Sequence, residues 1–344
     1  MTRAPLTFAD FWYVVAVSDR LTPGQVMSCT VRDEWLAVFR DRTGQPVAFR
    51  DRCMHRHSRL SQGQVHQGEL HCPYHGWVYD AQGQVVAVPS EGNRFQFSRA
   101  RCAKSYPTRE QNGYIYVCLG RPRPALPPYA LPHQGEPGWA TVRVVNRFEN
   151  SVTNCVENFI DIPHTVSVHP GIFRQARRQE LAMTVVREAG KVTATYRQET
   201  NNLGWFSRFL NPDGQTIQHC DRFIMPNITS VDYHMGDRRQ LWITSQAVPE
   251  TPTQTVVYTD VAFNYGGWTQ FARPLVYWTT QKIIGQDIRA LKIQQEVIAK
   301  YGQQFANTPA DRIHEWVESI HRELEQGRDP RDLATQSAEI TFWV

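Results

Sequence analysis

The N-terminal third of the chain has the hydrophobic pattern of short β-strands. Apolar and polar positions alternate over brief runs, and each run is followed by turn-forming residues. Three such runs are Glu34–Arg40, Pro46–Arg50 and Gly113–Leu119. Short strands with frequent turns predict a small all-β domain, which we place at residues 1–120.

A proline-dense segment follows at residues 121–139, with prolines from Pro122 to Pro137. Proline fixes φ and has no backbone N–H to donate, so neither a helix nor the middle of a sheet accommodates such a segment. We therefore predict a connector between two domains.

Residues 140–344 return to strand patterns and then change to helical ones. The expected strands are Thr141–Phe148, Met183–Arg187, Lys191–Gln198, Phe223–Tyr233, Gln240–Val248 and Thr253–Phe263. The second and third of these are expected to form a hairpin across the turn Ala189-Gly190.

Two helices are expected near the end of the chain. Gln281–Tyr301 is amphipathic and stops at Gly302, and Ala310–Gln326 is introduced by the capping pair Thr308-Pro309. Ile313, Trp316, Val317, Ile320 and Leu324 form one apolar stripe of the second helix. The fold class is therefore predicted to be α+β.

The length and net charge of the chain indicate how many domains it has and which partners it is expected to lack. A chain of 344 residues most naturally holds two domains. The net charge of +4 is too mild to indicate a nucleic-acid partner. No apolar run reaches membrane-spanning length, and the apolar segment Phe11–Val17 lies between charged residues, unlike a signal peptide. We expect a cytoplasmic protein with no membrane partner.

Two Cys/His pairs are the first candidate metal ligands in the chain. Cys53-Met54-His55 and Cys72-Pro73-Tyr74-His75 have the residue order and spacing of a Rieske [2Fe–2S] site, in which two thiolates hold one iron and two imidazoles hold the other. The alternative is a zinc ribbon. Zinc knuckles more often place two residues inside both pairs, so a one-residue gap followed by a two-residue gap favours iron–sulfur.

A second histidine pair follows the connector. His164 and His169 suit a non-haem iron site, which needs two imidazoles and one carboxylate on one face of the metal. Pro163 biases Ile162 away from helical geometry, and a break in the helix lets the two histidines converge. The alternative is a structural histidine pair.

The third ligand is expected to be a carboxylate. Asp161 is nearest in sequence, but Asp287 is the better candidate because it shares an apolar helix face with Ile284 and Leu291. A carboxylate on such a face must be paired or metal-bound. A salt bridge to a basic side chain is the alternative for Asp287.

Over nearly its full length the chain resembles the oxygenase components of Rieske non-haem iron oxygenases. The resemblance rests on Cys53-x-His55 with Cys72-x-x-His75, on Asp161-x-x-His164 with His169, and on Gln286-Asp287. It implies a helix-grip catalytic domain, an antiparallel sheet curved over a long helix. It also implies that Asp161 bridges His75 of one subunit and His164 of its neighbour, and hence a head-to-tail homotrimer.

The chain is short and has the layout of an α component alone. In this it is similar to one branch of the family, which contains toluenesulfonate methyl-monooxygenase, the saxitoxin-pathway oxygenases, and the dicamba and vanillate demethylases. Two positions depart from the family pattern. Met54 stands where the family commonly has proline, and His57 stands where it commonly has glycine. Neither is a ligand position, so the departures bear on the cluster's potential rather than on its presence.

The leading functional hypothesis is an O2-dependent monooxygenase. NADH electrons would arrive through a separate flavin/iron–sulfur reductase, since no Gly-rich dinucleotide fingerprint follows a strand. They would pass through the [2Fe–2S] cluster to a mononuclear Fe(II), and one oxygen atom would enter a methyl or other C–H group of a small aromatic substrate. The basic surplus slightly favours a sulfonate or carboxylate.

Three other functions stay open at this point: an O- or N-demethylase or alkaloid hydroxylase of the same family, a cis-dihydroxylating dioxygenase, and an electron-transfer protein without oxygenase chemistry. Several aromatic residues of the second domain are candidates either for the substrate cavity or for ordinary core: Trp205, Phe206, Tyr265, Trp268 and Phe271.

Overall fold

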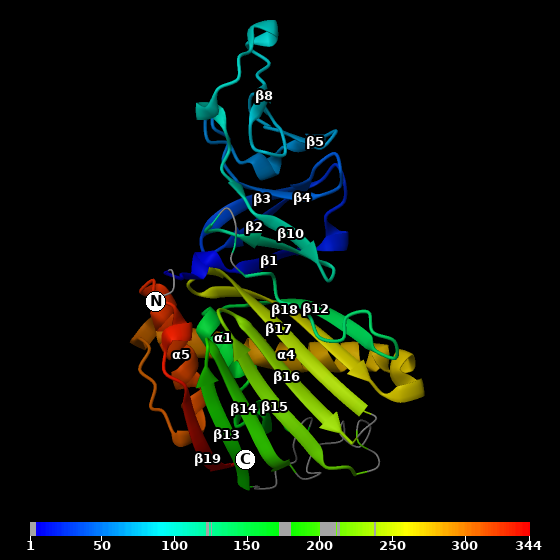
Figure 1. Ribbon diagram of the computed structural model, residues 1–344, viewed down its shortest axis with the longest axis vertical. Coiled ribbons are helices and arrows are strands. Elements are labelled where there is room, and N and C mark those ends of the chain that lie inside the picture. The colour runs from blue at the N-terminus through cyan, green and yellow to red at the C-terminus, as the bar shows by residue number, and fades with distance from the viewer. Residues whose placement is uncertain are drawn as a thin grey trace. The chain divides into compact units, whose positions relative to one another are not determined.

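The computed structural model describes residues 5–344 except 122, 123, 125, 172–179, 200–210, 212, 213, 237 and 238. The chain forms two compact units (Figure 1). The N-terminal unit is Ala9–Ala130, and the C-terminal unit contains Leu131–Val344 together with the described residues up to Phe8. The division between the units falls inside the proline-dense segment.

The N-terminal unit is built from three small antiparallel sheets, as its strand pattern predicts. The first has the order β1-β11-β10, with β1 Trp12–Val17, β10 Thr108–Gln111 and β11 Tyr114–Cys118. The second has the order β2-β3-β4-β9, with β2 Val26–Val31, β3 Glu34–Arg40, β4 Pro46–Arg50 and β9 Ser105–Tyr106. The third has the order β5-β6-β7-β8, with β5 Gln64–His66, β6 Glu69–His71, β7 Val78–Tyr79 and β8 Val85–Ala87.

The core of this unit surrounds the two Cys/His loops. Phe39 and Phe49 meet edge to face, with ring centroids 5.3 Å apart. Leu60, Leu70 and Tyr79 are fully buried in the same apolar cluster as Cys53 and Cys72. After the second pair, β7 and β8 are joined through the turn Asp80–Gly83.

The C-terminal unit contains one eight-stranded antiparallel sheet with the order β12-β18-β17-β16-β15-β14-β13-β19. Its strands are β12 Ala140–Phe148, β13 Glu180–Glu188, β14 Lys191–Glu199, β15 Ile217–Ile224, β16 Ile228–Met235, β17 Arg239–Thr251, β18 Gln254–Asn264 and β19 Gln336–Trp343. The expected β13–β14 hairpin is confirmed, and its turn residues Ala189 and Gly190 have φ values of 47° and 77°.

One expected strand was wrong. Phe223–Tyr233 is not continuous, because the chain turns at Met225-Pro226-Asn227 between β15 and β16. Pro226 cannot donate to a sheet ladder, so it stands in the turn rather than inside a central strand. The strand before this turn, β15, also begins earlier than expected, at Ile217.

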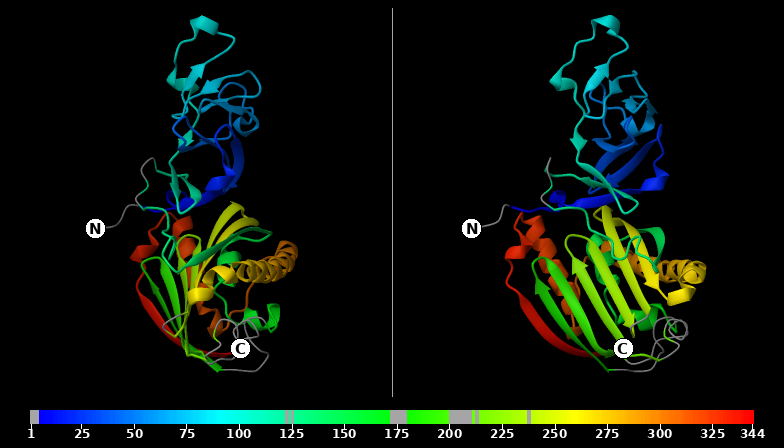
Figure 2. Two further views of the ribbon diagram at one scale, coloured as in Figure 1. Left: turned by 90° about the vertical axis from the view of Figure 1, so that its right-hand side faces the viewer. Right: turned by 45° about the vertical axis from the view of Figure 1, so that its right-hand side comes forward.

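Helices cover one face of the sheet. They are α1 Val152–Asn158, α2 His164–Val168, α4 Thr269–Tyr301 and α5 Arg312–Glu325. Figure 2 shows the long α4 crossing the sheet, and it contacts β12 and β18. This arrangement confirms the α+β class and the helix-grip architecture. No helix in the described part of the chain combines the length and the apolarity needed to cross a membrane.

Helix α4 is longer than expected, since it begins at Thr269 and not at Gln281. Pro274 lies in its second turn, where the missing N–H removes a single helical hydrogen bond, so the helix continues through it. Helix α5 starts with a 3₁₀ turn, Pro309–Asp311, which carries a capping box between Thr308 and Asp311. The apolar stripe predicted for α5 is buried against the sheet.

Candidate metal centres and substrate cavity

The two Cys/His loops of the N-terminal unit share one backbone arrangement. In each loop the cysteine N–H donates to the carbonyl five residues later, at Ser58 (2.8 Å) and at Trp77 (2.9 Å). In each loop the cysteine carbonyl accepts from the N–H four residues later, at His57 (3.0 Å) and at Gly76 (3.1 Å). Two differently spaced sequences therefore form matching turns.

These turns bring the four expected cluster residues together. Cys53 and Cys72 are buried and form no disulfide. The His55 and His75 rings lie with centroids 4.4 Å apart, and His55 stacks on Trp77 at 4.8 Å. His55 Nδ1 is buried without a partner among the described residues. Two thiols that form no disulfide and two neighbouring imidazoles, one with an unpaired nitrogen, are the donor set of a [2Fe–2S] centre with mixed ligands.

Tyr79 supports the cluster site and was missed by the sequence analysis. Its hydroxyl accepts a hydrogen bond from the Met54 N–H (3.0 Å) and lies 3.1 Å from Cys53 Sγ. A thiolate at Cys53 can only accept a hydrogen bond, so with a bound cluster the Tyr79 hydroxyl would donate to the sulfur. A proline at position 54 would have no N–H to give.

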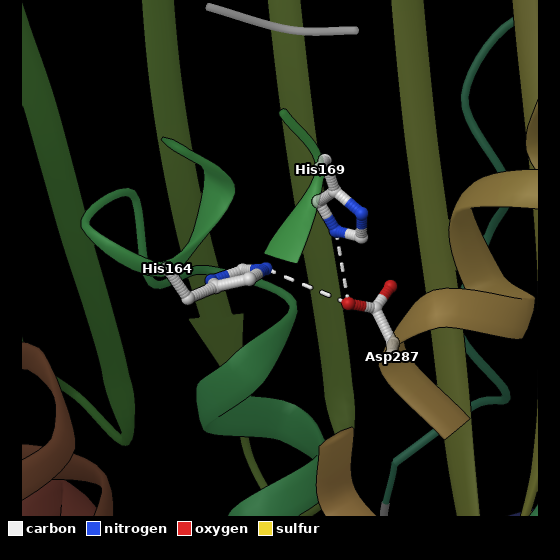
Figure 3. Close-up of side chains that lie close together, drawn as sticks. All are labelled: His164, His169 and Asp287. Atoms are coloured by element: carbon white, nitrogen blue, oxygen red, sulfur yellow. Dashed lines mark ion pairs between the residues drawn. The ribbon is translucent and has the colours of Figure 1, made fainter. Parts of the chain in front are cut away.

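The second centre lies in the C-terminal unit. His164 begins α2, His169 follows its end, and Asp287 projects from α4 toward both, as Figure 3 shows. Asp287 Oδ1 is 2.9 Å from His169 Nε2 and 3.6 Å from His164 Nε2. One ligand atom from each residue falls within 4.8 Å of the others. The structure thus gathers the three residues that the sequence singled out.

Two side chains orient the imidazoles. Gln286 Oε1 is 2.9 Å from His169 Nδ1, and Asp161 Oδ2 is 3.2 Å from His164 Nδ1. When Nδ1 donates to an oxygen, Nε2 keeps its lone pair for a metal. Both Nε2 atoms face Asp287, and the buried Asp287 Oδ1 accepts no well-formed hydrogen bond from the described residues. The set therefore fits a metal bound by two histidines and one carboxylate.

The charges of this centre influence one another. Burial alone would raise the pKa of Asp287, but the two neighbouring imidazoles outweigh burial and lower it. Burial alone would lower the pKa of His164, but contacts with Asp161 and Asp287 raise it to about 9. Burial raises the pKa of Glu157 to about 8, and the negative charge of Asp161 adds to this effect. A cation here would take the place of a proton on His164.

A cavity adjoins the triad. It contains about 890 Å³ of empty space, part of it open to solvent. The sheet side is lined by His219, Asp221, Thr229, Val231, Tyr233, Ile243, Ser245, Thr259 and Val261. The helix side is lined by residues of α1, α2 and α4 and of the segment between α1 and α2, including the triad.

The aromatic residues considered as candidates for this cavity do not line it where the structure describes them. Tyr265 is buried but does not line the cavity. Trp268 and Phe271 are 70% and 78% exposed, so they are neither cavity nor core residues. Phe271 lies in the first turn of α4, and Trp268 lies in the 3₁₀ turn just before it. Trp205 and Phe206 lie outside the described residues.

The sequence analysis also missed His219 and Asp221, which lie on β15 before the strand expected there. Their spacing of two residues was the available signal, because side chains two apart in a strand point to the same face. Gln286 was noted as part of a motif, but no contact was assigned to it.

Comparison with known proteins agrees with both centres. Residues 11–107 match the protein-family model of the Rieske [2Fe-2S] domain. Residues 149–332, more than half of the chain, match that of the vanillate O-demethylase oxygenase C-terminal domain.

Two curated relatives are informative. The chain is 35% identical over 307 residues to a 4beta-methylsterol monooxygenase of Methylococcus capsulatus, covering 83% of this chain and 80% of the relative. It is 29% identical over 189 residues to a putative toluene-4-sulfonate monooxygenase iron-sulfur subunit of Comamonas testosteroni, covering 54% of each. Against the first curated relatives it matches, the chain spans only 25% to 54% of their length.

Among solved structures, dicamba monooxygenase bound to dicamba superposes with a TM-score of 0.81 at 22% identity, covering 93% of this chain and 98% of that one. At this identity the likeness shows the fold. With the two family matches and the sterol monooxygenase relative, it leads to one conclusion: the chain belongs to the Rieske non-haem iron oxygenases.

Proposed function

We propose that the chain is the oxygenase component of a monooxygenase that hydroxylates a methyl group of an uncharged ring compound. The observation that carries this proposal is the position of the His164–His169–Asp287 triad, which lines the cavity of a chain that also has a Rieske domain. In the overall reaction R–CH3, O2, two electrons and two protons give R–CH2OH and water.

Each predicted ligand has a proposed role. Cys53 and Cys72 hold one iron of the cluster, and His55 and His75 hold the other. His164, His169 and Asp287 hold the mononuclear iron, which supplies the activation of dioxygen when bound. The chain's own contribution is to fix the imidazoles through Gln286 and Asp161 and to keep the substrate beside the triad.

Electron delivery is proposed to involve two partners. NADH electrons reach the cluster through a separate flavin/iron–sulfur reductase. They cross from His75 of one subunit to His164 of the next through Asp161, in a head-to-tail homotrimer. The contact of Asp161 Oδ2 with His164 Nδ1 supports this role, and Asp161 Oδ1 accepts no hydrogen bond from any described residue, which leaves it available to a partner.

The substrate class follows from the cavity and from the relatives. Lys and Arg are absent from the described residues that line the cavity, so a sulfonate or carboxylate would meet Asp221 without a cationic partner there. The relative with the broadest coverage among those described above is named for a methylated sterol, which is an uncharged ring compound. An O- or N-methyl substrate would undergo the same hydroxylation and then lose the carbon as formaldehyde.

The test is turnover with a surrogate reductase, NADH and ¹⁸O2 on a panel of methylated aromatic and polycyclic compounds. Mass spectrometry is expected to find one ¹⁸O atom in an alcohol product. Asp287→Ala is expected to abolish product, whereas Glu296→Ala, an exposed acid on the same helix, leaves it unchanged. No substrate-dependent O2 uptake by protein that retains its iron would indicate an electron-transfer protein instead.

A further inference from the structure

A buried acid–imidazole pair lies in the substrate cavity on its sheet side. His219 and Asp221 both line the cavity from β15, and each is at most 3% exposed. His219 Nε2 is 2.8 Å from Asp221 Oδ1. Neither residue belongs to the His164–His169–Asp287 triad, so the pair is a second polar group in the same cavity.

The sheet holds the His219 ring rigidly. In the strand register Tyr196 of β14, His219 of β15 and Tyr233 of β16 stand directly opposite one another. The imidazole is stacked between the two phenol rings, with centroid distances of 4.6 Å and 4.2 Å and interplanar angles of 20°. Such a sandwich fixes the plane of the imidazole, and with it the position of the Asp221 carboxylate.

The burial of this pair needs an explanation, because a buried carboxylate is costly unless its oxygens are satisfied. His219 satisfies Oδ1. The second oxygen, Oδ2, accepts no hydrogen bond from a side chain that the structure describes. Since an ionised carboxylate only accepts, the group that completes the site must donate.

We propose that His219 and Asp221 anchor the substrate by binding a hydroxyl group of an uncharged molecule, so that Asp221 accepts a hydrogen bond from the hydroxyl. A hydroxyl suits the rest of the lining as well, because Thr229, Ser245 and Thr259 offer further hydroxyl partners on the neighbouring strands. An anionic substituent has no proton to give and is repelled by Asp221. This inference rests on the proposed function, since it names the class of substrate for that cavity.

The test measures binding and not turnover. Holoprotein is titrated by calorimetry with two matched series. One is p-cresol, toluene and toluene-4-sulfonate, and the other is a 4,4-dimethylated sterol with its 3-deoxy analogue. In at least one series the alcohol is expected to bind about tenfold or more tightly than the analogue without the hydroxyl. Tighter binding of toluene-4-sulfonate than of p-cresol, equal binding of the hydroxylated and unhydroxylated compounds in both series, or no binding of either hydroxylated compound overturns the proposal.

Variants then locate the effect. Asp221→Asn is expected to reduce the preference for the alcohol at least tenfold. Asp232→Asn is the matched control, because this acid lies on the adjacent strand and points to the other face of the sheet, where it pairs with Arg222 and His234. An unchanged preference in Asp221→Asn contradicts the proposal. If that variant fails to fold, the wild-type series still decides.

The outcomes separate the two proposals. Alcohol-selective binding without oxygenated product leaves the anchor standing and refutes the proposed reaction. Oxygenated product without any preference for a hydroxyl supports the proposed reaction and refutes the anchor.

Discussion

Tyr79 links the cluster site to the core of the N-terminal unit through a single hydroxyl group. A hydrogen bond to a ligand sulfur stabilises the more negative, reduced form of a cluster. Tyr79→Phe removes the bond to Cys53 Sγ and is expected to lower the reduction potential by about 60 mV, the equivalent of roughly one such bond. Spectroelectrochemical titration measures it. Tyr116→Phe, in buried β11, is the control, and an equal shift in both variants contradicts the assignment.

Gln286 acts on the mononuclear centre through His169. Loss of its acceptor oxygen frees the imidazole to rotate or change tautomer, so Gln286→Ala is expected to weaken iron binding about 10–100-fold. Iron retention during dialysis against a graded chelator measures this. Gln281, on the same helix, donates to the Tyr277 hydroxyl and not to a ligand. Gln281→Ala should therefore retain iron like the wild type.

Glu157 is expected to be a neutral acid at physiological pH. Because burial raises its pKa to about 8, the carboxyl is protonated below that pH and ionises above it, unlike an exposed glutamate. Infrared spectra at pH 7 of protein with the mononuclear iron removed should contain a protonated carboxyl band that disappears in Glu157→Gln. No difference between the two proteins in the protonated-carboxyl region at pH 7 would show that Glu157 is already ionised.

At the scale of elements, the paired cluster loops explain the departure at position 57. His57 and Gly76 stand at equivalent places, with φ values of 57° and 67°. A residue with a side chain pays about 1–2 kcal/mol for this left-handed conformation, and glycine does not. Histidine is one of the residues that tolerate it.

His57→Gly is therefore expected to stabilise the N-terminal unit by about 1 kcal/mol, because the exposed His57 side chain gives up little packing. The thermal midpoint of cluster loss measures the change. Arg56→Gly changes the preceding loop residue, which does not have positive φ, and should lower the midpoint. A lower midpoint for His57→Gly would contradict the backbone explanation.

The elements also show where sequence patterns suffice. Glu34–Arg40 and Pro46–Arg50 were predicted with their observed bounds, because alternation and flanking turns are local signals. The β15–β16 turn was missed because apolar residues continue through Met225-Pro226, and only the proline marked it. The start of α4 was missed because burial against the sheet, and not helix propensity, extends it to Thr269.

At the scale of the whole molecule, residues far apart in sequence meet at the second centre. His164, His169 and Asp287 could be proposed from composition, spacing and the polarity of one helix face, together with the family resemblance. The His219–Asp221 pair could not, because its position depends on the register of the sheet, which places Tyr196 and Tyr233 on either side of it. Metal ligands can be proposed from residue types and spacing, whereas the residues that line a cavity depend on how the strands and helices pack.

The most direct test of the account is the iron content of the purified, iron-replete chain together with its acid-labile sulfide. The account predicts three irons and two sulfides per chain, and two irons with an unchanged cluster spectrum in Asp287→Ala. Two irons per chain in the wild type, with nothing bound beside His164, would contradict it.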